Sequence, residues 1–253
     1  MESEAEREKR GKAVYMREKE PYRVPQKRKP FFRCFKQFLK LFVRKPEIVS
    51  LGGKPEERAI VVSNHSAASG LLTLELYYPN FFIPWGTFEM CQNYRGRFRY
   101  LNTVYYRQKK KYPAPVSFVF AAVAAAVTRG VYKGMQLLPS YPDARLLGTI
   151  RKSVRILDEG KSVLIFPEDS SDGYKELLTE YYAGFVFLAK TYRRLRGVDL
   201  PVYNCYFHKK KRLLIIDRPV YLKELFDRGM NEHEIAAFFK DRVNALAREY
   251  LGK

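Results

Sequence analysis

Short apolar runs alternate with amphipathic stretches along the chain, and this alternation predicts an α/β fold. Apolar runs predict strands at 58–63, 162–166, 200–207 and 212–216. Apolar positions at helical spacing predict helices at 67–78, 116–133, 144–159, 174–196 and from Asn231 to the end of the chain. Strands that alternate with helices favour a mostly parallel mixed sheet with helices on its faces. We therefore expect one α/β domain over residues 47–253.

A different pattern precedes this domain at residues 30–46, PFFRCFKQFLKLFVRKP. At about 100° per residue, the Phe and Leu side chains fall on one side of a helix and the Lys and Arg side chains on the other. Such a helix is typical of an amphipathic anchor that lies in a membrane surface. A helix that packs on the domain with its basic face in water has the same pattern, so both interpretations stay open. If it is an anchor, replacing Phe35, Phe38 and Phe42 with Ser should release the folded protein from anionic vesicles.

Charge adds to this picture. Residues 1–29 are highly charged and nearly free of large aliphatic side chains, which predicts a basic flexible arm and no signal peptide. The chain has 47 Lys and Arg residues against 27 Asp and Glu residues, a net charge of +20. A charge of this size favours an anionic partner: a membrane surface, a phosphorylated substrate or nucleic acid.

Three widely spaced cysteines indicate neither a zinc site nor a disulfide framework, so we expect no metal and a cytoplasmic environment. The longest apolar run, residues 116–128, has 13 residues. A membrane-spanning helix needs about 20 apolar residues. We therefore expect 116–133 to be a buried helix and any membrane association to be peripheral.

Two of the predicted strands end in polar clusters. SNHSAASG, residues 63–70, follows the first strand, and FPEDSSDGY, residues 166–174, follows the second. In open α/β sheets, ligand sites lie at the carboxyl ends of strands. We therefore expect His65 and Glu168 to face one pocket, within about 10 Å of each other.

In this order, the two clusters resemble the motifs of the glycerolipid (lysophospholipid) acyltransferase family, in particular the 1-acylglycerol-3-phosphate acyltransferases. Asn64-His65 is similar to the start of the family's N-H-x-x-x-x-D motif, and Phe166-Pro167-Glu168 to the start of its F-P-E-G-T-R motif. LPVYNC, residues 200–205, is similar to a later family strand. The resemblance covers residues 47–222 and implies a glycerol-3-phosphate acyltransferase-like fold.

The resemblance also implies an activity in lipid metabolism. A fatty acyl group would pass from acyl-CoA or acyl carrier protein to the hydroxyl of a lysolipid, at the cytoplasmic face of an anionic membrane and with no bound cofactor. It implies that His65 is the general base and that Glu168 positions the acceptor. The other substrate-binding residues it implies are Asn64, Phe166, Pro167 and Ser170.

The chain departs from the family pattern where charged residues are expected. Gly70 stands where the family has its aspartate, and Ser140 where its second motif has arginine. The third motif has Asp169, Ser170 and Ser171 in place of Gly-Thr-Arg. These departures suggest an acceptor that lacks the usual phosphate, or a phosphate that Arg145 or Arg151 holds instead.

Several acids are candidates for the missing carboxylate. Asp169 is our first choice as a catalytic partner of His65, followed by Asp172 and Glu75. Gly70→Asp should restore part of the activity lost without such an acid, provided that position 70 faces the imidazole.

Two other interpretations remain. The chain could be an inactive relative that binds lipid or acyl donor, or His65 could be a structural histidine in an unrelated protein. Residues 92–112 interleave basic and aromatic side chains, as in proteins that bind single-stranded nucleic acid. No nucleic-acid-binding motif accompanies them, so an insertion that meets a membrane or covers an acyl groove fits better. The basic run 208–212, HKKKR, is expected at a hairpin turn, either solvated or in contact with anionic headgroups.

Overall fold

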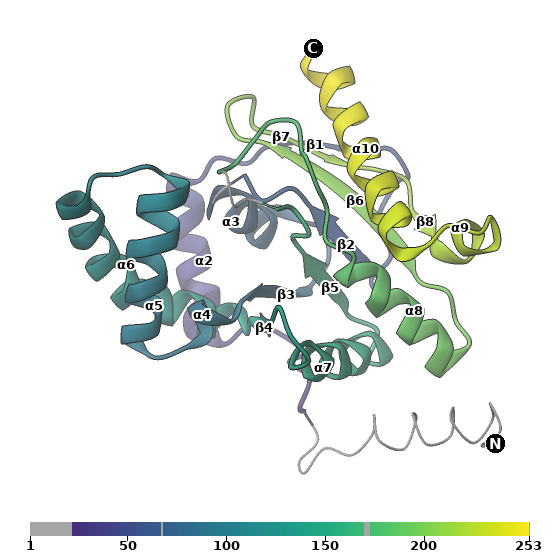
Figure 1. Cartoon of the computed structure of the whole chain (residues 1–253), viewed down its shortest axis with the longest axis horizontal. Helices are drawn as coiled ribbons and strands as arrows, with labels where there is room; N and C mark the ends of the chain where they lie inside the picture. Colours follow the sequence, from purple (N-terminus) through teal and green to yellow (C-terminus); the bar gives the residue numbers. More distant parts are fainter. Residues whose placement is uncertain (1–21, 67, 170–172, 253) are drawn as a thin grey trace.

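The computed structural model describes residues 22–66, 68–169 and 173–252. In this part of the chain, eight strands form one sheet in the order β1-β7-β6-β2-β5-β3-β4, and β8 pairs with β6 (Figure 1). The strands are β1 (Glu47–Ser50), β2 (Ile60–Ser63), β3 (Phe82–Thr87), β4 (Leu138–Ser140), β5 (Ser162–Ile165), β6 (Pro201–His208), β7 (Leu213–Ile216) and β8 (Val220–Tyr221). Only the pairs of β6 with β7 and β8 are antiparallel. The predicted α/β class with a mostly parallel mixed sheet is confirmed.

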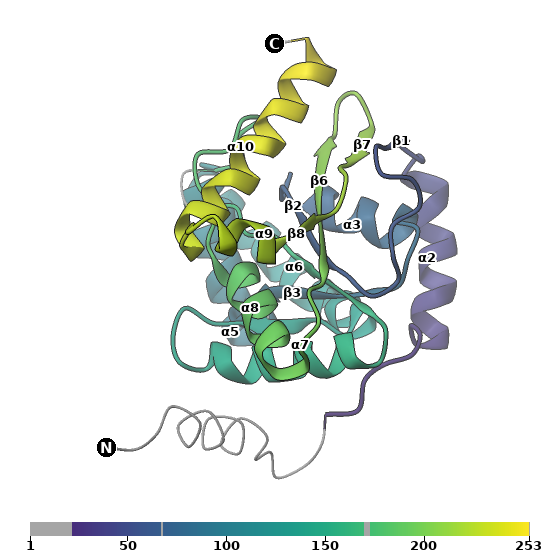
Figure 2. The ribbon, with the colours of Figure 1, turned by 90° about the vertical axis from the view of Figure 1, so that its right-hand side faces the viewer.

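Helices cover both faces of this sheet. They are α2 (Pro30–Phe42), α3 (Ala68–Tyr77), α4 (Phe88–Cys91), α5 (Tyr94–Tyr100), the π-helix η1 (Leu101–Lys109), α6 (Ala114–Met135), α7 (Leu146–Asp158), α8 (Gly184–Arg196), α9 (Leu222–Asp227) and α10 (Glu232–Leu251). Figure 2 shows α7, α8 and α10 on one face and α2 and α3 on the other. Ile60 and Val62 of β2 join the core on the α7–α8–α10 face, and Val61 joins the core on the α2–α3 face. This alternation is the period of a strand that is buried on both faces.

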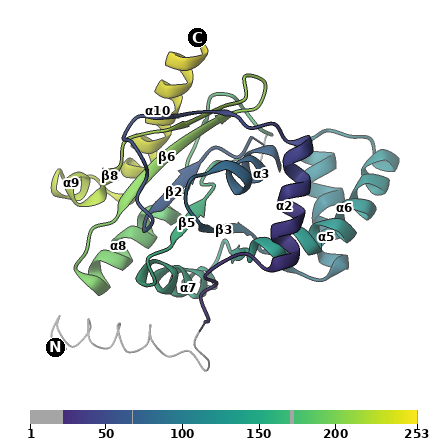
Figure 3. The ribbon, with the colours of Figure 1, turned by 180° about the vertical axis from the view of Figure 1, so that it is seen from behind.

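A third group of helices lies at the β4 end of the sheet, where α4, α5, η1 and α6 pack together (Figures 1 and 3). The segment 92–112, which has no clean periodicity, forms α5 and η1. Phe98, Tyr105 and Tyr106 from this segment pack around Ala121 and Ala125 of α6. Most of the aromatic side chains that suggested base stacking therefore pack within a helical cluster.

The helix predicted at 116–133 is present as α6, but the prediction that it is buried is wrong. Its buried side is a narrow stripe, and Val119, Val123 and Val127 on its outer side are 62%, 62% and 59% exposed. Phe118 and Phe120 are also exposed. By length and composition, this is the one helix in the described residues that could cross a membrane, and only 17% of its most apolar window is buried. Ala121 and Ala125 face the protein, whereas most of the large apolar side chains of α6 face outward.

The helix predicted at 174–196 is too long at its start. Only Gly184–Arg196 is helical, and residues 173–183 form an irregular segment that returns to β5. Tyr181 forms an antiparallel bridge with Glu168, and the Tyr182 amide donates a hydrogen bond to the Pro167 carbonyl oxygen at 2.8 Å. These contacts place the segment beside the second polar strand end.

The predicted flexible arm ends earlier than residue 29. Residues 1–21 lie outside the described part of the chain, but 22–29 pack on the domain. Val24 and Arg28 are buried. Val24 joins the core on the α7–α8 side of the sheet, and Arg28 is hydrogen-bonded to Glu75 of α3. Residues 22–29 therefore belong to the folded unit.

Candidate functional site

The two polar strand ends meet at the centre of the sheet. Strands β2 and β5 are parallel neighbours, with Val62 opposite Ile165, so their carboxyl ends lie side by side. The His65 backbone N–H donates a hydrogen bond to Glu168 Oε2 at 2.6 Å across 103 residues of sequence. The expected proximity of His65 and Glu168 is confirmed, whereas a pocket shared by their side chains stays a prediction.

Aromatic rings surround the His65 imidazole. Its ring centroid lies 4.9 Å from that of Phe166 and 5.3 Å from that of Tyr174. Ser66, the next residue, has a φ of +40°, which is unusual for a residue with a side chain. Such backbone conformations concentrate at functional sites, where the surrounding structure holds them in place.

The Glu168 carboxyl group is buried, with only 7% of the residue exposed. Burial disfavours the charged form and raises its pKa to about 7, against an ordinary value of 4.5. The His65 N–H and the charge of Lys109 act in the opposite direction. Near neutral pH this carboxyl group is therefore divided between its acid and carboxylate forms, and it connects the two strand ends.

Helix η1 brings cationic side chains to the same place. Lys109 Nζ lies 5.8 Å from the centroid of the Tyr174 ring, and Lys110 Nζ lies 5.6 Å from it. Burial lowers the pKa of Lys109, while Asp169 and Glu168 raise it. A π-helix is rare and occurs disproportionately at functional sites. The insertion at 92–112 therefore reaches the candidate site through the C-terminal end of η1.

Asp169, our first choice for the carboxylate partner of His65, contacts Tyr182. Its carboxylate accepts a hydrogen bond from the Tyr182 hydroxyl, and its charge acts on Lys109. Its backbone N–H donates to the Glu180 carbonyl oxygen at 3.2 Å. Asp169 thus lies next to Glu168 at the site. Ser170 and Asp172 fall outside the described residues.

Asn64 is buried and connects strands. Its Nδ2 donates to the Phe207 carbonyl oxygen at 3.0 Å, and its Oδ1 accepts from the Phe207 N–H at 2.7 Å. Both ends of the side-chain amide are thereby used on β6. This geometry makes Asn64 a residue that positions the strand end before His65, rather than one whose amide is available to substrate.

Arg145 is not brought to His65. It follows β4, which lies three strands from β2, about 14 Å at ordinary strand spacing. Its guanidinium forms an exposed pair with Asp143 at 2.7 Å and lies over the rings of Phe88 and Tyr141. The proposed role in holding an acceptor phosphate near His65 is therefore not supported by its position.

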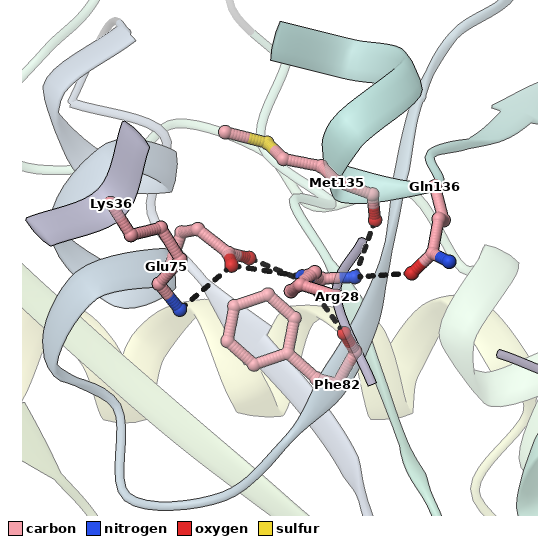
Figure 4. A network of polar contacts seen from close by, with 6 residues as sticks. All are labelled: Arg28, Lys36, Glu75, Phe82, Met135 and Gln136. Atoms are coloured by element: carbon pink, nitrogen blue, oxygen red, sulfur yellow. Dashed lines mark hydrogen bonds and ion pairs between the residues drawn. The ribbon is translucent and has the colours of Figure 1, made fainter. Parts of the chain in front are cut away.

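Glu75, the third candidate acid, lies in a buried polar network with Arg28 and Lys36 (Figure 4). It accepts two hydrogen bonds from the Arg28 guanidinium and pairs with Lys36 Nζ at 2.9 Å. Arg28 also donates to the backbone carbonyl oxygens of Met135 and Phe82. Glu75 is therefore excluded as the carboxylate partner, because its charge is used to fasten residues 22–36 to α3.

Gly70 has no room for the family's aspartate. A Cβ at this position would lie 2.2 Å from the His65 carbonyl oxygen and 3.3 Å from the Asn64 carbonyl oxygen. Both are backbone atoms, which cannot move away as the end of a long side chain can. We therefore no longer expect Gly70→Asp to restore activity, because the helix approaches the strand end too closely.

Two residues of the site are missing from the motif-based prediction. Tyr174 contacts the imidazole, and Lys109 acts on Glu168 and Asp169. Tyr174 is the last residue of the second polar cluster but also the first of the helix predicted at 174–196, and Lys109 lies in a segment without periodicity, so the motifs single out neither residue. Among the described residues, no group of three or more His, Cys, Asp or Glu side chains could hold a metal ion.

Comparison with known proteins does not assign this chain to a family. A scan against protein-family models found no match to this chain. A search of curated proteins likewise found none. The interpretation of the site therefore rests on its own residues and their geometry.

Proposed function

We propose that this protein transfers an acyl group from an acyl thioester to a lipid-like hydroxyl at the cytoplasmic face of a membrane. The observation that carries the proposal is the hydrogen bond of 2.6 Å between the His65 backbone and Glu168. It joins the N-H and F-P-E clusters at adjacent parallel strand ends, the place where α/β sheets bind ligands.

In this proposal His65 is the general base. Its imidazole takes the proton of the acceptor hydroxyl, and the oxygen attacks the thioester carbonyl carbon. The tetrahedral intermediate then collapses, the C–S bond breaks, and the thiolate takes the proton from the imidazolium. The product is an oxygen ester and a free thiol of coenzyme A or acyl carrier protein.

The other residues of the site have supporting roles. Glu168 is a positioning residue that holds the backbone at His65, and Asn64 holds the same strand end on β6. Phe166 and Tyr174 form apolar walls beside the imidazole, which suits an acyl chain. Asp169 is the acid nearest in sequence to Glu168 and remains our choice for the group that stabilises the imidazolium.

Two neighbouring helices support membrane contact. Helix α2 exposes Phe31, Phe38, Leu41 and Phe42, and α6 exposes its outer valines. Phe32 of α2 packs on Gly134 of α6, so both helices lie at the same end of the molecule (Figure 3). Phe35 packs against the core, so Phe38, Leu41 and Phe42 are the better residues to change in α2.

The test is turnover by purified protein with acyl-CoA and acyl carrier protein donors and a panel of lysolipids, with products read by mass spectrometry. His65→Ala should lower kcat by at least about 100-fold, the ordinary contribution of a general base. His233→Ala is the matched control, because His233 lies at the start of α10 and its backbone N–H donates to Asn231 Oδ1, a bond that the substitution keeps. It should keep full activity.

Asp169→Asn tests whether the Asp169 carboxylate takes part in catalysis. A large loss of kcat with an unchanged thermal unfolding curve would place Asp169 in the mechanism, and full activity would remove it. If the native protein turns over no donor and acceptor pair, the proposal fails. Retained binding of acyl donor or lysolipid would then favour the non-catalytic, lipid-binding alternative.

A further inference from the structure

A cavity of about 680 Å³ lies at the β4 end of the molecule, away from His65 and Glu168. It is open to solvent and is lined by α4, the start of α5, the C-terminal turns of α6, β4, α7 and the chain at 22–25. Four of its lining residues are cations, Arg97, Arg129, Lys133 and Lys152, and none is Asp or Glu. None of the residues assigned to acyl transfer lines it, so this is a separate place on the molecule.

Arg97 is the buried cation of this cavity. Its residue is only 3% exposed, and its guanidinium donates to the backbone carbonyl oxygens of Ala125, at 3.0 Å, and Gln92. In the described part of the chain, no carboxylate lies within ion-pair distance of it. Burial and the charge of Arg129 both lower its pKa, as expected for a cation among cations.

The second buried arginine provides the comparison. Arg28 is as deeply buried as Arg97, and it pairs with the Glu75 carboxylate within the protein. A buried charge without a counter-charge is costly unless something neutralises it. The protein supplies that partner for Arg28, whereas for Arg97 it supplies an open cavity with three more cations.

We propose that this cavity binds a phosphate-bearing group. Guanidinium groups match phosphate oxygens in a two-point geometry, and lysines add point charges around it. Several positive charges without an acid suit an anion that carries more than one negative charge. The cavity volume lies within the range of small-molecule sites, about 300–1,000 Å³.

The phosphate could belong to a lipid headgroup or to a soluble phosphoester, and both would meet the same cations. Arg129 and Lys133 lie on α6, the helix that also exposes Val119, Val123 and Val127. A headgroup in the cavity would thus leave its acyl chains next to an apolar surface. The proposal does not depend on acyl transfer, because it concerns binding at other residues.

The test compares two double variants with the same change in charge. Arg129→Gln with Lys133→Gln alters the cavity, and both side chains are exposed, so the fold should survive. Lys54→Gln with Arg228→Gln removes two exposed positive charges elsewhere and serves as the control. Circular dichroism checks that both variants keep the native helix content.

Binding is measured in two arms. Calorimetric titration with inorganic phosphate and glycerol phosphate probes the soluble source. Flotation with phosphatidylcholine vesicles that contain phosphatidate probes the lipid source, and vesicles with oleate at matched surface potential supply charge without a phosphomonoester. We expect the cavity variant to lose at least tenfold in affinity for phosphate in one or both arms, while the control and the His65→Ala variant bind as the native protein does.

Each outcome is decisive. A loss confined to phosphatidate vesicles assigns the site to a lipid headgroup, and a loss confined to the titration assigns it to a soluble phosphoester. Equal losses in the cavity variant and the control, equal losses on oleate and phosphatidate vesicles, or no phosphate binding by the native protein in either arm would overturn the proposal. Because the readout is binding, failure here would leave the acyl-transfer proposal unaffected.

Discussion

Glu168 is placed where one carboxyl group can link two distant segments. It accepts the His65 N–H, and the bridge to Tyr181 beside it ties residues 173–183 to β5. Burial that raises its pKa to about 7 also makes the stability of the protein depend on pH. The neutral acid is favoured in the folded state, so its contribution is present at low pH. It is lost as pH rises from about 4.5 to 7.

Glu168→Gln should remove this dependence, because the amide keeps an acceptor oxygen but does not titrate. Between pH 5 and pH 7 the free energy of unfolding of the native protein should fall by about 2 kcal/mol relative to that of the variant. Urea unfolding at several pH values measures this difference. Parallel pH profiles for the two proteins would show that Glu168 titrates near its ordinary pKa.

Gly70 is a residue whose importance is steric. Gly70→Asp should lower the free energy of unfolding by about 2–3 kcal/mol, since a side chain would be forced against backbone atoms of Asn64 and His65. It should not raise the activity of an Asp169→Asn protein. Thermal and urea unfolding together with the turnover assay check both statements.

Gly148→Asp is the matched control for Gly70→Asp. Gly148 lies in α7, and a Cβ there would meet nothing within 4 Å. An acid in the first turns of a helix also complements its dipole. This control should therefore unfold within about 0.5 kcal/mol of the native protein. Restored turnover in the Gly70→Asp protein would mean that α3 and the strand end can separate.

At the scale of elements, α6 stands out because it is an apolar helix whose outer side is exposed. It has 22 residues, and its packed side consists of small side chains such as Ala121 and Ala125. Exposed apolar patches of this kind mark interaction sites on soluble proteins or contact with lipid. The net charge of +20 favours an anionic lipid surface as the partner.

Replacing Val119, Val123 and Val127 with Ser should weaken binding to anionic vesicles by at least about tenfold, because each valine loses apolar area that the lipid would cover. The three positions form one stripe at a spacing of four residues. Vesicle flotation measures the effect. Leu147→Ser with Val198→Ser, two exposed apolar residues elsewhere, is the control and should bind normally. Unchanged binding of the folded α6 variant would remove this helix from the membrane contact.

At the scale of the whole molecule, the buried polar contacts of Arg28 hold the N-terminal segment on the domain. Arg28 joins α3 through Glu75, the end of α6 through Met135, and β3 through Phe82 (Figure 4). The helix α2 that follows is thereby held against α3 and α6. The proposed membrane-facing helices and the candidate site thus belong to one packed unit.

Arg28→Ala should lower the free energy of unfolding by roughly 3–5 kcal/mol, since it leaves the Glu75 carboxylate buried beside Lys36 alone. Arg196→Ala is the matched control. Its pair with Asp158 is partly exposed, so it should cost less than about 1 kcal/mol. Urea unfolding of both variants gives the comparison, and equal small effects would show that the buried network contributes little.

Local patterns in the sequence determined much of the secondary structure. The strands β2, β5, β6 and β7 and the helices α7 and α10 lie where apolar runs and amphipathic spacing predicted them. Asn231 and Glu234 form the expected capping box at the start of α10. Such signals are complete within a few residues, because hydrogen bonding and side-chain period are local properties. The two polar strand ends were found for the same reason.

Only the tertiary structure decided which faces are covered and which acids meet which bases. The spacing of apolar residues in α6 is the same whether its outer side meets protein, lipid or water. The ion pair of Glu75 with Arg28 and the contact of Tyr174 with His65 join segments that are distant in sequence. The close approach at Gly70 depends on how α3 meets the end of β2. Burial, charge pairing and steric room are properties of the neighbours that the fold supplies, so no local pattern in the chain contains them.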